Sequence, residues 1–152
     1  MIALVPFDAS DLSKAALRRA KEYADALGDW AIVATSVLPD DERYVRSRGW
    51  VDEDDGFSLE KAAEYLEDEV AEIAPNAAFE HSVIGGYSTK GSIATELGSV
   101  IREYDPSIVF IGSDNVGRIA TPVTSVGGRA ASAGDYDVYV VRKPKPSEIE
   151  GL

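Results

Sequence analysis

The sequence predicts one α/β domain built on an open parallel β-sheet with helices on both faces. Short apolar runs alternate with amphipathic helical patterns, which favours parallel strands joined by right-handed crossovers. The chain has 152 residues, 45% of them hydrophobic, which is enough to bury a core without disulfides or a structural metal. No internal repeat or second domain is visible. We expect one domain over residues 1–142 and an extended tail over residues 143–152, because Pro144 and Pro146 cannot continue a strand.

The first strand and helix are marked by a proline and a serine. Residues 2–5 are apolar and are followed by Pro6, which predicts a buried strand that leaves its sheet. Ser10 is placed to cap a helix whose apolar residues recur at spacings of three and four as far as Leu27. Gly28 ends this helix.

The second strand and the next long helix follow the same alternation. Residues 31–38 are apolar on both faces apart from small hydroxyl residues, which is typical of a strand covered by helices on both sides. Ser58 precedes a strongly amphipathic helix that Pro75 stops. The carboxylates of this helix lie opposite its apolar stripe, so they predict a solvated face rather than an acid/base pair.

An acidic connection over residues 40–57 joins these two elements. It is too long for an ordinary turn, and we expect it to fold partly over the domain. Trp50 and Phe57 within it have two possible roles, as a lid over a site or as a cover for the core.

The second half of the chain supplies three strands and two helices. We expect strands at 77–84, 108–111 and 138–141, a helix at 92–104, and a short helix near 125–133. The segment between the last two strands is rich in glycine and hydroxyl residues, which is typical of a loop.

The formal net charge of −12 comes from 27 acidic and 15 basic residues. Such a charge repels phosphate backbones and anionic membranes at long range, so we expect neither nucleic-acid nor membrane partners. The same excess suits an acidic interaction surface, or a halophilic protein whose self-repulsion is screened at high salt. Stability that rises with salt concentration would support the halophilic interpretation.

The sequence contains no cysteine and a single histidine, His81. This composition excludes Cys/His zinc sites, thiol catalysis and redox motifs, and it makes a Ser-His-Asp triad a poor interpretation. No apolar run has the roughly 20 residues that a membrane span needs, and the N-terminus lacks the pattern of a signal peptide. We therefore expect a cytoplasmic protein.

Two loops are placed to form a binding site. In open parallel sheets, ligands bind outside the carboxyl ends of strands where the strand order reverses. Residues 6–10 follow the first strand, and residues 112–118 follow the fourth and lead toward Ser125. Backbone N–H groups in a glycine loop and at a helix N-terminus can hold phosphate oxygens without many basic side chains, and Arg118 would add one full charge.

At these loops the chain resembles the universal stress protein family. The resemblance rests on Val5-Pro6-x-Asp8-x-Ser10 after the first strand, the alternating α/β plan, and the glycine/serine loop before the last strand. It implies a five-stranded parallel sheet in the order 3-2-1-4-5, with a Rossmann-like fold of the adenine nucleotide alpha hydrolase type. That order places the two loops opposite one another.

The ATP-binding branch of the family carries a glycine motif after strand four: glycine, two residues, glycine, nine residues, then glycine followed by serine or threonine. Here Gly112 and Ser125 match, whereas Asn115 and Thr124 stand where the motif has glycine, and the loop is one residue short. A second register over Gly117 displaces the motif toward the last strand. The motif is therefore degraded, and a Cβ at these positions disfavours close approach to phosphate.

The resemblance implies a ligand position residue by residue. Pro6, Phe7 and Asp8 would lie beside the base, and Val37 would offer adenine a backbone contact. Ribose and phosphate contacts would come from Ile111, Gly112, Asn115, Thr124, Ser125 and Val126. Arg118, which we include for its charge and not for the resemblance, would add a phosphate contact. The implied ligand is ATP with Mg²⁺, another adenine nucleotide, or a different small anion.

Two functions stay open from the sequence. The first is a stress-response regulator or sensor that binds a nucleotide, and the second is a ligand-free dimeric adaptor of the same fold. Enzymatic turnover beyond weak ATP hydrolysis lacks support, because no base, metal cluster or nucleophile pair accompanies Asp8. The resemblance also implies a homodimer through the last strand, which begins at Val138 and ends at Val141 and whose bare apolar edge would risk aggregation.

Overall fold

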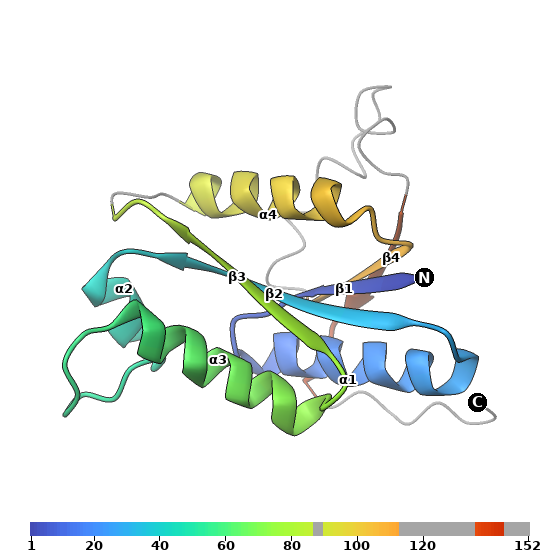
Figure 1. Ribbon diagram of the computed structural model, residues 1–152, viewed down its shortest axis with the longest axis horizontal. Coiled ribbons are helices and arrows are strands. Elements are labelled where there is room, and N and C mark those ends of the chain that lie inside the picture. Colours follow the sequence, from blue (N-terminus) through green and yellow to red (C-terminus); the bar gives the residue numbers. More distant parts are fainter. Residues whose placement is uncertain (87–89, 113–135, 145–152) are drawn as a thin grey trace.

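The sheet has five parallel strands in the order β3-β2-β1-β4-β5, which confirms the predicted fold class and strand order. The computed structural model describes residues 1–86, 90–112 and 136–144. The elements in chain order are β1 (Ile2–Pro6), α1 (Asp11–Leu27), β2 (Ala31–Pro39), α2 (Glu42–Ser47), α3 (Leu59–Ile73), β3 (Ala78–Ile84), α4 (Lys90–Tyr104), β4 (Ile108–Gly112) and β5 (Asp137–Val141). Helices α1 and α3 cover one face of the sheet and α4 covers the other (Figure 1).

The helix boundaries follow from local capping. The Ser10 hydroxyl accepts a hydrogen bond from the backbone N–H of Ser13 at 3.2 Å, and Ser58 accepts one from Lys61 at 3.3 Å. These bonds satisfy N–H groups that have no partner within their own helix. Gly28 ends α1 with φ +67°, a left-handed conformation that glycine adopts without a steric penalty. The predicted starts of these two helices are confirmed.

Helix α2 was not predicted and lies within the acidic connection. The Asp41 carboxylate caps it by accepting from the N–H of Tyr44 at 3.2 Å, and Arg46 pairs with Glu42 one turn earlier at 3.0 Å. A single hydrophobic residue of this short helix, Val45, is fully buried. One buried position gives no periodic signal, so the hydrophobic pattern could not reveal the helix.

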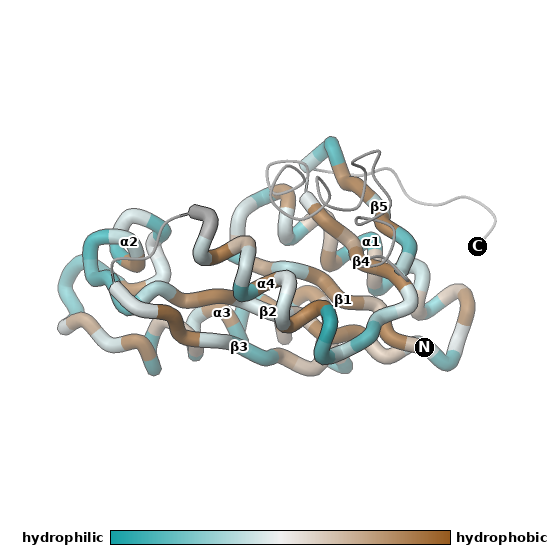
Figure 2. Tube along the Cα trace, turned by 90° about the horizontal axis from the view of Figure 1, so that it is seen from above, coloured by the Kyte–Doolittle hydropathy of each residue, from teal (hydrophilic) through white to brown (hydrophobic). Residues whose placement is uncertain are grey.

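The hydrophobic core is divided by the sheet into two clusters. The larger cluster packs α1 and α3 onto the sheet and includes Leu17, Leu66 and Phe110. The smaller cluster packs α4 onto the opposite face and includes Leu4 and Val109. The central strands are hydrophobic along most of their length, whereas polar residues lie on the outer surfaces of the helices (Figure 2).

Three sequence predictions fall on parts of the chain outside the described residues. These are the short helix near 125–133, most of the glycine-rich loop, and the tail beyond residue 144. Within the described residues, no helix is long and apolar enough to cross a membrane.

Candidate functional site

The turn after β1 is fixed to β2 by hydrogen bonds on both sides of one residue. The N–H of Phe7 donates to the carbonyl of Thr35 at 2.8 Å, and the Ser36 hydroxyl donates to the carbonyl of Phe7 at 2.6 Å. Because both backbone groups of Phe7 are bonded, the next residue, Asp8, is held at the carboxyl edge of the sheet. This is the edge where ligands bind in open α/β sheets.

Asp8 is oriented by the first turn of α1. One carboxylate oxygen of Asp8 accepts from the N–H of Ser10 at 2.9 Å, and the backbone N–H of Asp8 donates to the Ser13 hydroxyl at 3.3 Å. Between Asp8 and Ser10, Ala9 takes φ +62°, which is uncommon for a residue with a side chain. The short turn therefore adopts a strained conformation that these hydrogen bonds maintain.

A small pocket opens beside this turn, on the face of the sheet covered by α4. Its volume is about 30 Å³, which is room for about two water molecules. The lining residues are Pro6, Phe7, Asp8, Thr35, Val37, Tyr44, Arg48, Trp50, Ile93 and Leu97. They come from the carboxyl ends of β1 and β2, from α2 and the turn after it, and from the first half of α4.

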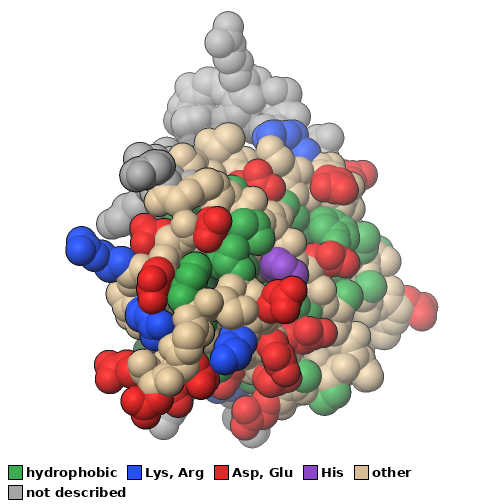
Figure 3. Space-filling model, turned by 60° about the vertical axis from the view of Figure 1, so that its left-hand side comes forward, with side chains coloured by type: hydrophobic (Ala, Val, Ile, Leu, Met, Phe, Trp, Pro, Cys, Tyr) green, Lys and Arg blue, Asp and Glu red, His purple; other side chains and the backbone are tan. Residues whose placement is uncertain are grey.

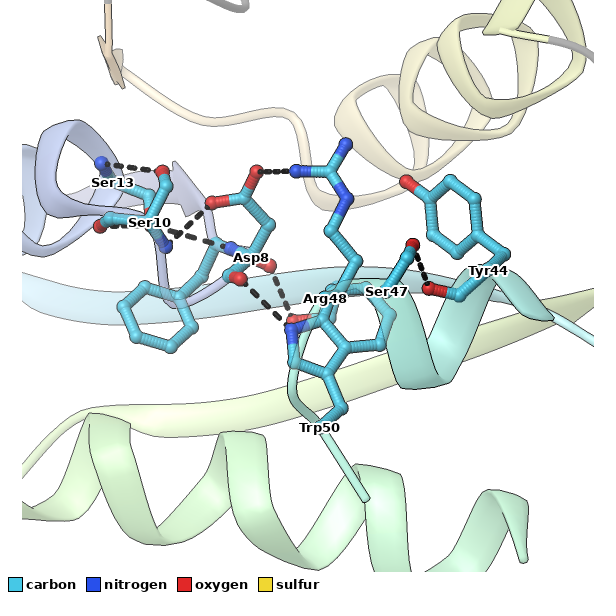
Figure 4. A network of polar contacts seen from close by, with 9 residues as sticks. Asp8, Ser10, Ser13, Tyr44, Ser47, Arg48 and Trp50 are labelled. Atoms are coloured by element: carbon cyan, nitrogen blue, oxygen red, sulfur yellow. Dashed lines mark hydrogen bonds and ion pairs between the residues drawn. The ribbon is translucent and has the colours of Figure 1, made fainter. Parts of the chain in front are cut away.

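The segment that contains α2 closes one side of the pocket (Figure 4). The Trp50 indole N–H donates to the carbonyl of Asp8 at 3.0 Å, and an Arg48 guanidinium nitrogen lies 3.5 Å from a carboxylate oxygen of Asp8. The guanidinium carbon of Arg48 lies 5.1 Å from the centroid of the Tyr44 ring. Arg48 is thus placed between a carboxylate and an aromatic face.

Buried apolar side chains anchor this segment. Val45, Trp50 and Val51 are 0%, 2% and 5% exposed, and the N–H of Asp40 bonds to the carbonyl of Ile84 at 2.9 Å. Trp50 therefore covers the core, as one of the two predicted roles had it, and also lines the pocket. Phe57 is partly buried and packs against the larger core cluster, but it is not among the pocket residues.

Thr35 contributes a polar atom to the pocket wall. The residue is 1% exposed, and its hydroxyl oxygen has no hydrogen-bond partner among the described residues. A buried hydroxyl normally finds a partner, since leaving it unpaired costs free energy. A ligand or a water molecule in the pocket that Thr35 lines would be a partner for this oxygen.

Four of the predicted site residues are brought together, namely Pro6, Phe7, Asp8 and Val37. Ile111 is fully buried in the smaller core cluster and does not line the pocket. Gly112, the last residue of β4, is not among the pocket residues either. The other five candidates lie outside the described residues: Asn115, Arg118, Thr124, Ser125 and Val126.

Gly112 has a packing reason to be glycine. A Cβ at this position would lie 2.8 Å from the Leu12 Cβ and 3.0 Å from the Leu12 backbone carbon. The end of β4 therefore approaches the first turn of α1 more closely than any larger residue allows.

Sequence reasoning did not place five of the pocket residues in a site: Thr35, Tyr44, Arg48, Ile93 and Leu97. Thr35 had a weak signal, because it is polar within a strand that is apolar on both sides. Arg48 and Tyr44 had none, since their place depends on how the acidic connection folds back onto Asp8, 40 residues earlier than Arg48.

The acidic excess spreads over the outer surface rather than into the pocket. Figure 3 shows acidic side chains across the face that carries His81, which is exposed and stacks on Phe79 with ring centroids 6.0 Å apart. In the part of the chain that the structure describes, no three His, Asp or Glu side chains are grouped to hold a metal ion. Of the described residues that line the pocket, Asp8 and Arg48 are the charged ones.

Comparison with known proteins agrees with this architecture. The profile of the universal stress protein family matches residues 1–142. No curated protein matches the chain.

Several solved structures share the fold. The hypothetical protein MJ0577 is 17% identical, with a TM-score of 0.55 and coverage of 96% of this chain and 97% of that one. A universal stress family protein from Burkholderia pseudomallei is 20% identical, with a TM-score of 0.54 and coverage of 92% and 94%. A universal stress protein from Archaeoglobus fulgidus is also 20% identical, with a TM-score of 0.51 and coverage of 93% and 97%.

Proposed function

This chain belongs to the universal stress protein family, and from that premise we propose that it is a cytoplasmic regulator or sensor that binds an adenine nucleotide. The base would enter the pocket beside Asp8, and the phosphates would extend along the crevice between β1 and β4. Because the glycine motif is degraded, the proposal includes a different small anionic ligand at the same crevice.

One observation carries the proposal. Pro6, Phe7, Asp8 and Val37, which the family resemblance places around a base, lie on the wall of a single pocket. They come from two strands whose carboxyl ends meet at the edge of the sheet where ligands bind in such folds. The pocket combines apolar walls with few polar groups, which is the usual composition of a site for a heteroaromatic ring.

The phosphate half of the proposed site belongs to the loop after β4. We expect Gly112, Asn115, Thr124 and Ser125 to offer backbone and hydroxyl hydrogen bonds to phosphate oxygens, with Arg118 adding charge. Ile111 and Val126 would flank the ribose. If ATP is the ligand, phosphate oxygens and water would supply most of the ligands of Mg²⁺, as is usual for this ion.

Calorimetric titration of the full chain with ATP, ADP and AMP tests the proposal, and native mass spectrometry of the purified protein detects nucleotide that is already bound. Asp8→Asn removes the charge beside the base, and a hydrogen bond to a charged group is worth enough that roughly tenfold weaker binding is expected. Asp11→Asn, a neighbouring carboxylate outside the pocket lining, is the matched control. Absence of heat with all three nucleotides at millimolar concentration would contradict the proposal.

A second proposed function is a dimeric adaptor that needs no ligand. The observation that favours it is the position of β5, an outer strand of the sheet in which Val138, Tyr139 and Val140 are only half-buried. An apolar edge strand invites pairing with another chain, so we propose a homodimer through β5. Sedimentation of the wild type should give a dimer, and Val140→Lys should shift it toward monomer. A wild type that is monomeric at all concentrations would contradict the dimer and this function.

The high acidic charge supports a further part of the proposal, that the protein is halophilic. Salt screens repulsion between surface carboxylates, since the Debye length falls to about 3 Å at 1 M. Urea unfolding should therefore show a higher midpoint in molar salt than in dilute buffer. An unchanged midpoint would count against halophilic adaptation without affecting the nucleotide proposal.

A further inference from the structure

The side chain of Arg48 lines the pocket and lies between Asp8 and Tyr44, two groups that a bound base would contact. Its guanidinium lies 3.5 Å from the Asp8 carboxylate and 5.1 Å from the centroid of the Tyr44 ring. Figure 4 shows it extended between these residues, with the Trp50 indole bonded to Asp8 nearby. Arg48 comes from the turn after α2, and no sequence pattern placed it at the site.

The chemistry of a guanidinium suits a position between a carboxylate and an aromatic ring. It is planar and delocalised, it carries N–H donors that suit a carboxylate, and it stacks on aromatic rings. An amine-bearing heteroaromatic base is also planar, donates N–H hydrogen bonds and stacks on aromatic rings. Either group would donate N–H hydrogen bonds from its edge to the Asp8 carboxylate and would stack its face on the Tyr44 ring.

We propose that Arg48 is an internal occupant of the base site, and that ligand binding exchanges the Arg48–Asp8 ion pair for contacts between the base, Asp8 and Tyr44. This inference rests on the proposed function. It assigns Tyr44 a stacking role and makes Arg48 a competitor that lowers affinity for the base.

The size of the pocket requires some part of its wall to move. A volume of about 30 Å³ holds about two water molecules, whereas ligand pockets measure roughly 300–1,000 Å³. Helix α2 is a poor candidate for this movement, because displacing it would expose Val45 and Trp50, which are 0% and 2% exposed. The Arg48 side chain is 35% exposed, and among the described residues it is held by a long ion pair to Asp8 and by the face of Tyr44. Its displacement therefore loses far less.

The hydroxyl of Thr35 is an independent sign that the pocket accepts a ligand. Its oxygen is buried on the pocket wall with no partner among the described residues. A base that replaces Arg48 would bring ring nitrogens or an amino group into this space. Thr35 would then gain a hydrogen bond that the described residues do not provide.

Titration with adenosine tests the exchange, because an uncharged probe removes the general attraction of Arg48 for phosphate. Arg48→Met keeps the length of the side chain and removes its charge. The control is Arg43→Met, in helix α2 just before Arg48 and outside the pocket lining. We expect Arg48→Met to bind adenosine roughly two- to fivefold more tightly than the wild type, as the loss of a partly exposed ion pair predicts. Arg43→Met should bind as the wild type does, and the advantage of Arg48→Met should shrink as salt weakens the ion pair.

A second measurement needs no ligand and keeps the two proposals separate. In a Trp30→Phe background, Trp50 is the remaining tryptophan, and acrylamide quenching reports the access of solvent to the pocket that it lines. Arg48→Met should raise the quenching constant, whereas Arg43→Met should not. Unchanged quenching in Arg48→Met would overturn the internal occupant, as would equal adenosine affinity in both variants. Increased quenching with no binding of adenosine or any nucleotide would instead support the occupant and refute the proposed function.

Discussion

The two faces of the sheet are built differently. The face under α1 and α3 is covered by two helices and a continuous cluster of buried side chains, with Leu17 and Leu66 fully enclosed. The opposite face is covered by α4 and a smaller cluster, and the pocket beside Asp8 lies at its edge. From the described residues we infer that the face under α1 and α3 supplies most of the stability, whereas the face under α4 borders the space for a ligand.

The largest expected effect is a difference in stability between cavities made on the two faces. Leu66→Ala, on the face covered by α1 and α3, should lower the free energy of unfolding by about 2–5 kcal/mol, because a fully buried leucine leaves a void that its neighbours cannot fill. Leu97→Ala, which borders an existing pocket, should cost less. Urea unfolding of both variants measures the difference, and equal losses would contradict the division of roles between the faces.

The next effect concerns the close approach of β4 to α1. Gly112→Ala should destabilise the protein by about 1–3 kcal/mol, as overpacking does, since its Cβ would lie 2.8 Å from the Leu12 Cβ. The double variant Leu12→Ala/Gly112→Ala tests whether backbone contact is responsible. Because the new Cβ would also approach the Leu12 backbone, at 3.0 Å and 3.1 Å, shortening the Leu12 side chain should recover little stability. Full recovery would show that the side chain alone sets the distance.

Thr35→Val tests the pocket with almost no change in the shape of the side chain. Removing a buried hydroxyl that has no partner among the described residues should leave the free energy of unfolding unchanged or raise it by about 1 kcal/mol. The same substitution should weaken nucleotide binding, since the ligand loses a hydrogen bond. Thermal unfolding and calorimetry measure the two quantities. A clear loss of stability with intact binding would mean that Thr35 serves the fold rather than the site.

The smallest expected effect on stability comes from an ion pair between α1 and α3. Lys14 of α1 pairs with Glu69 of α3 at 2.9 Å, and the hydrogen bond to Glu69 raises the pKa of Lys14 above its ordinary value of 10.5. A raised lysine pKa stabilises the fold fully below pH 10.5, and this contribution disappears as pH rises through the higher, folded-state value. Lys14→Met should therefore cost at most about 1 kcal/mol at neutral pH. The difference from wild type should vanish in strongly alkaline solution, and a constant difference would contradict the ion pair.

The sequence predicted the parts of this molecule that depend on local rules. Ser10 and Ser58 cap helices as their positions indicated, and the apolar run that becomes β2 is buried over nearly all its length. Strand order came from the family resemblance at the first turn, rather than from periodicity. The candidate residues around Asp8 lie together because they follow directly from the ends of β1 and β2, and their role in binding stays a prediction.

The parts that depend on contacts between distant segments could not be predicted. Helix α2 carries one buried hydrophobic residue, and the pairing of Arg48 with Asp8 spans 40 residues. The buried hydroxyl of Thr35 reads as an ordinary strand residue until its surroundings are known. These features share a cause, since each depends on how the acidic connection packs across the carboxyl end of the sheet.

The most direct test of nucleotide binding beside Asp8 uses the two tryptophan indoles of the chain. Trp50 donates its indole N–H to the carbonyl of Asp8, whereas Trp30 precedes β2 at the opposite edge of the sheet. In a titration of ¹⁵N-labelled protein with ATP, we predict that the Trp50 indole resonance moves saturably and that the Trp30 resonance stays in place. A Trp50 resonance that does not move at millimolar ATP, or two resonances that move alike, would contradict a nucleotide site at this pocket.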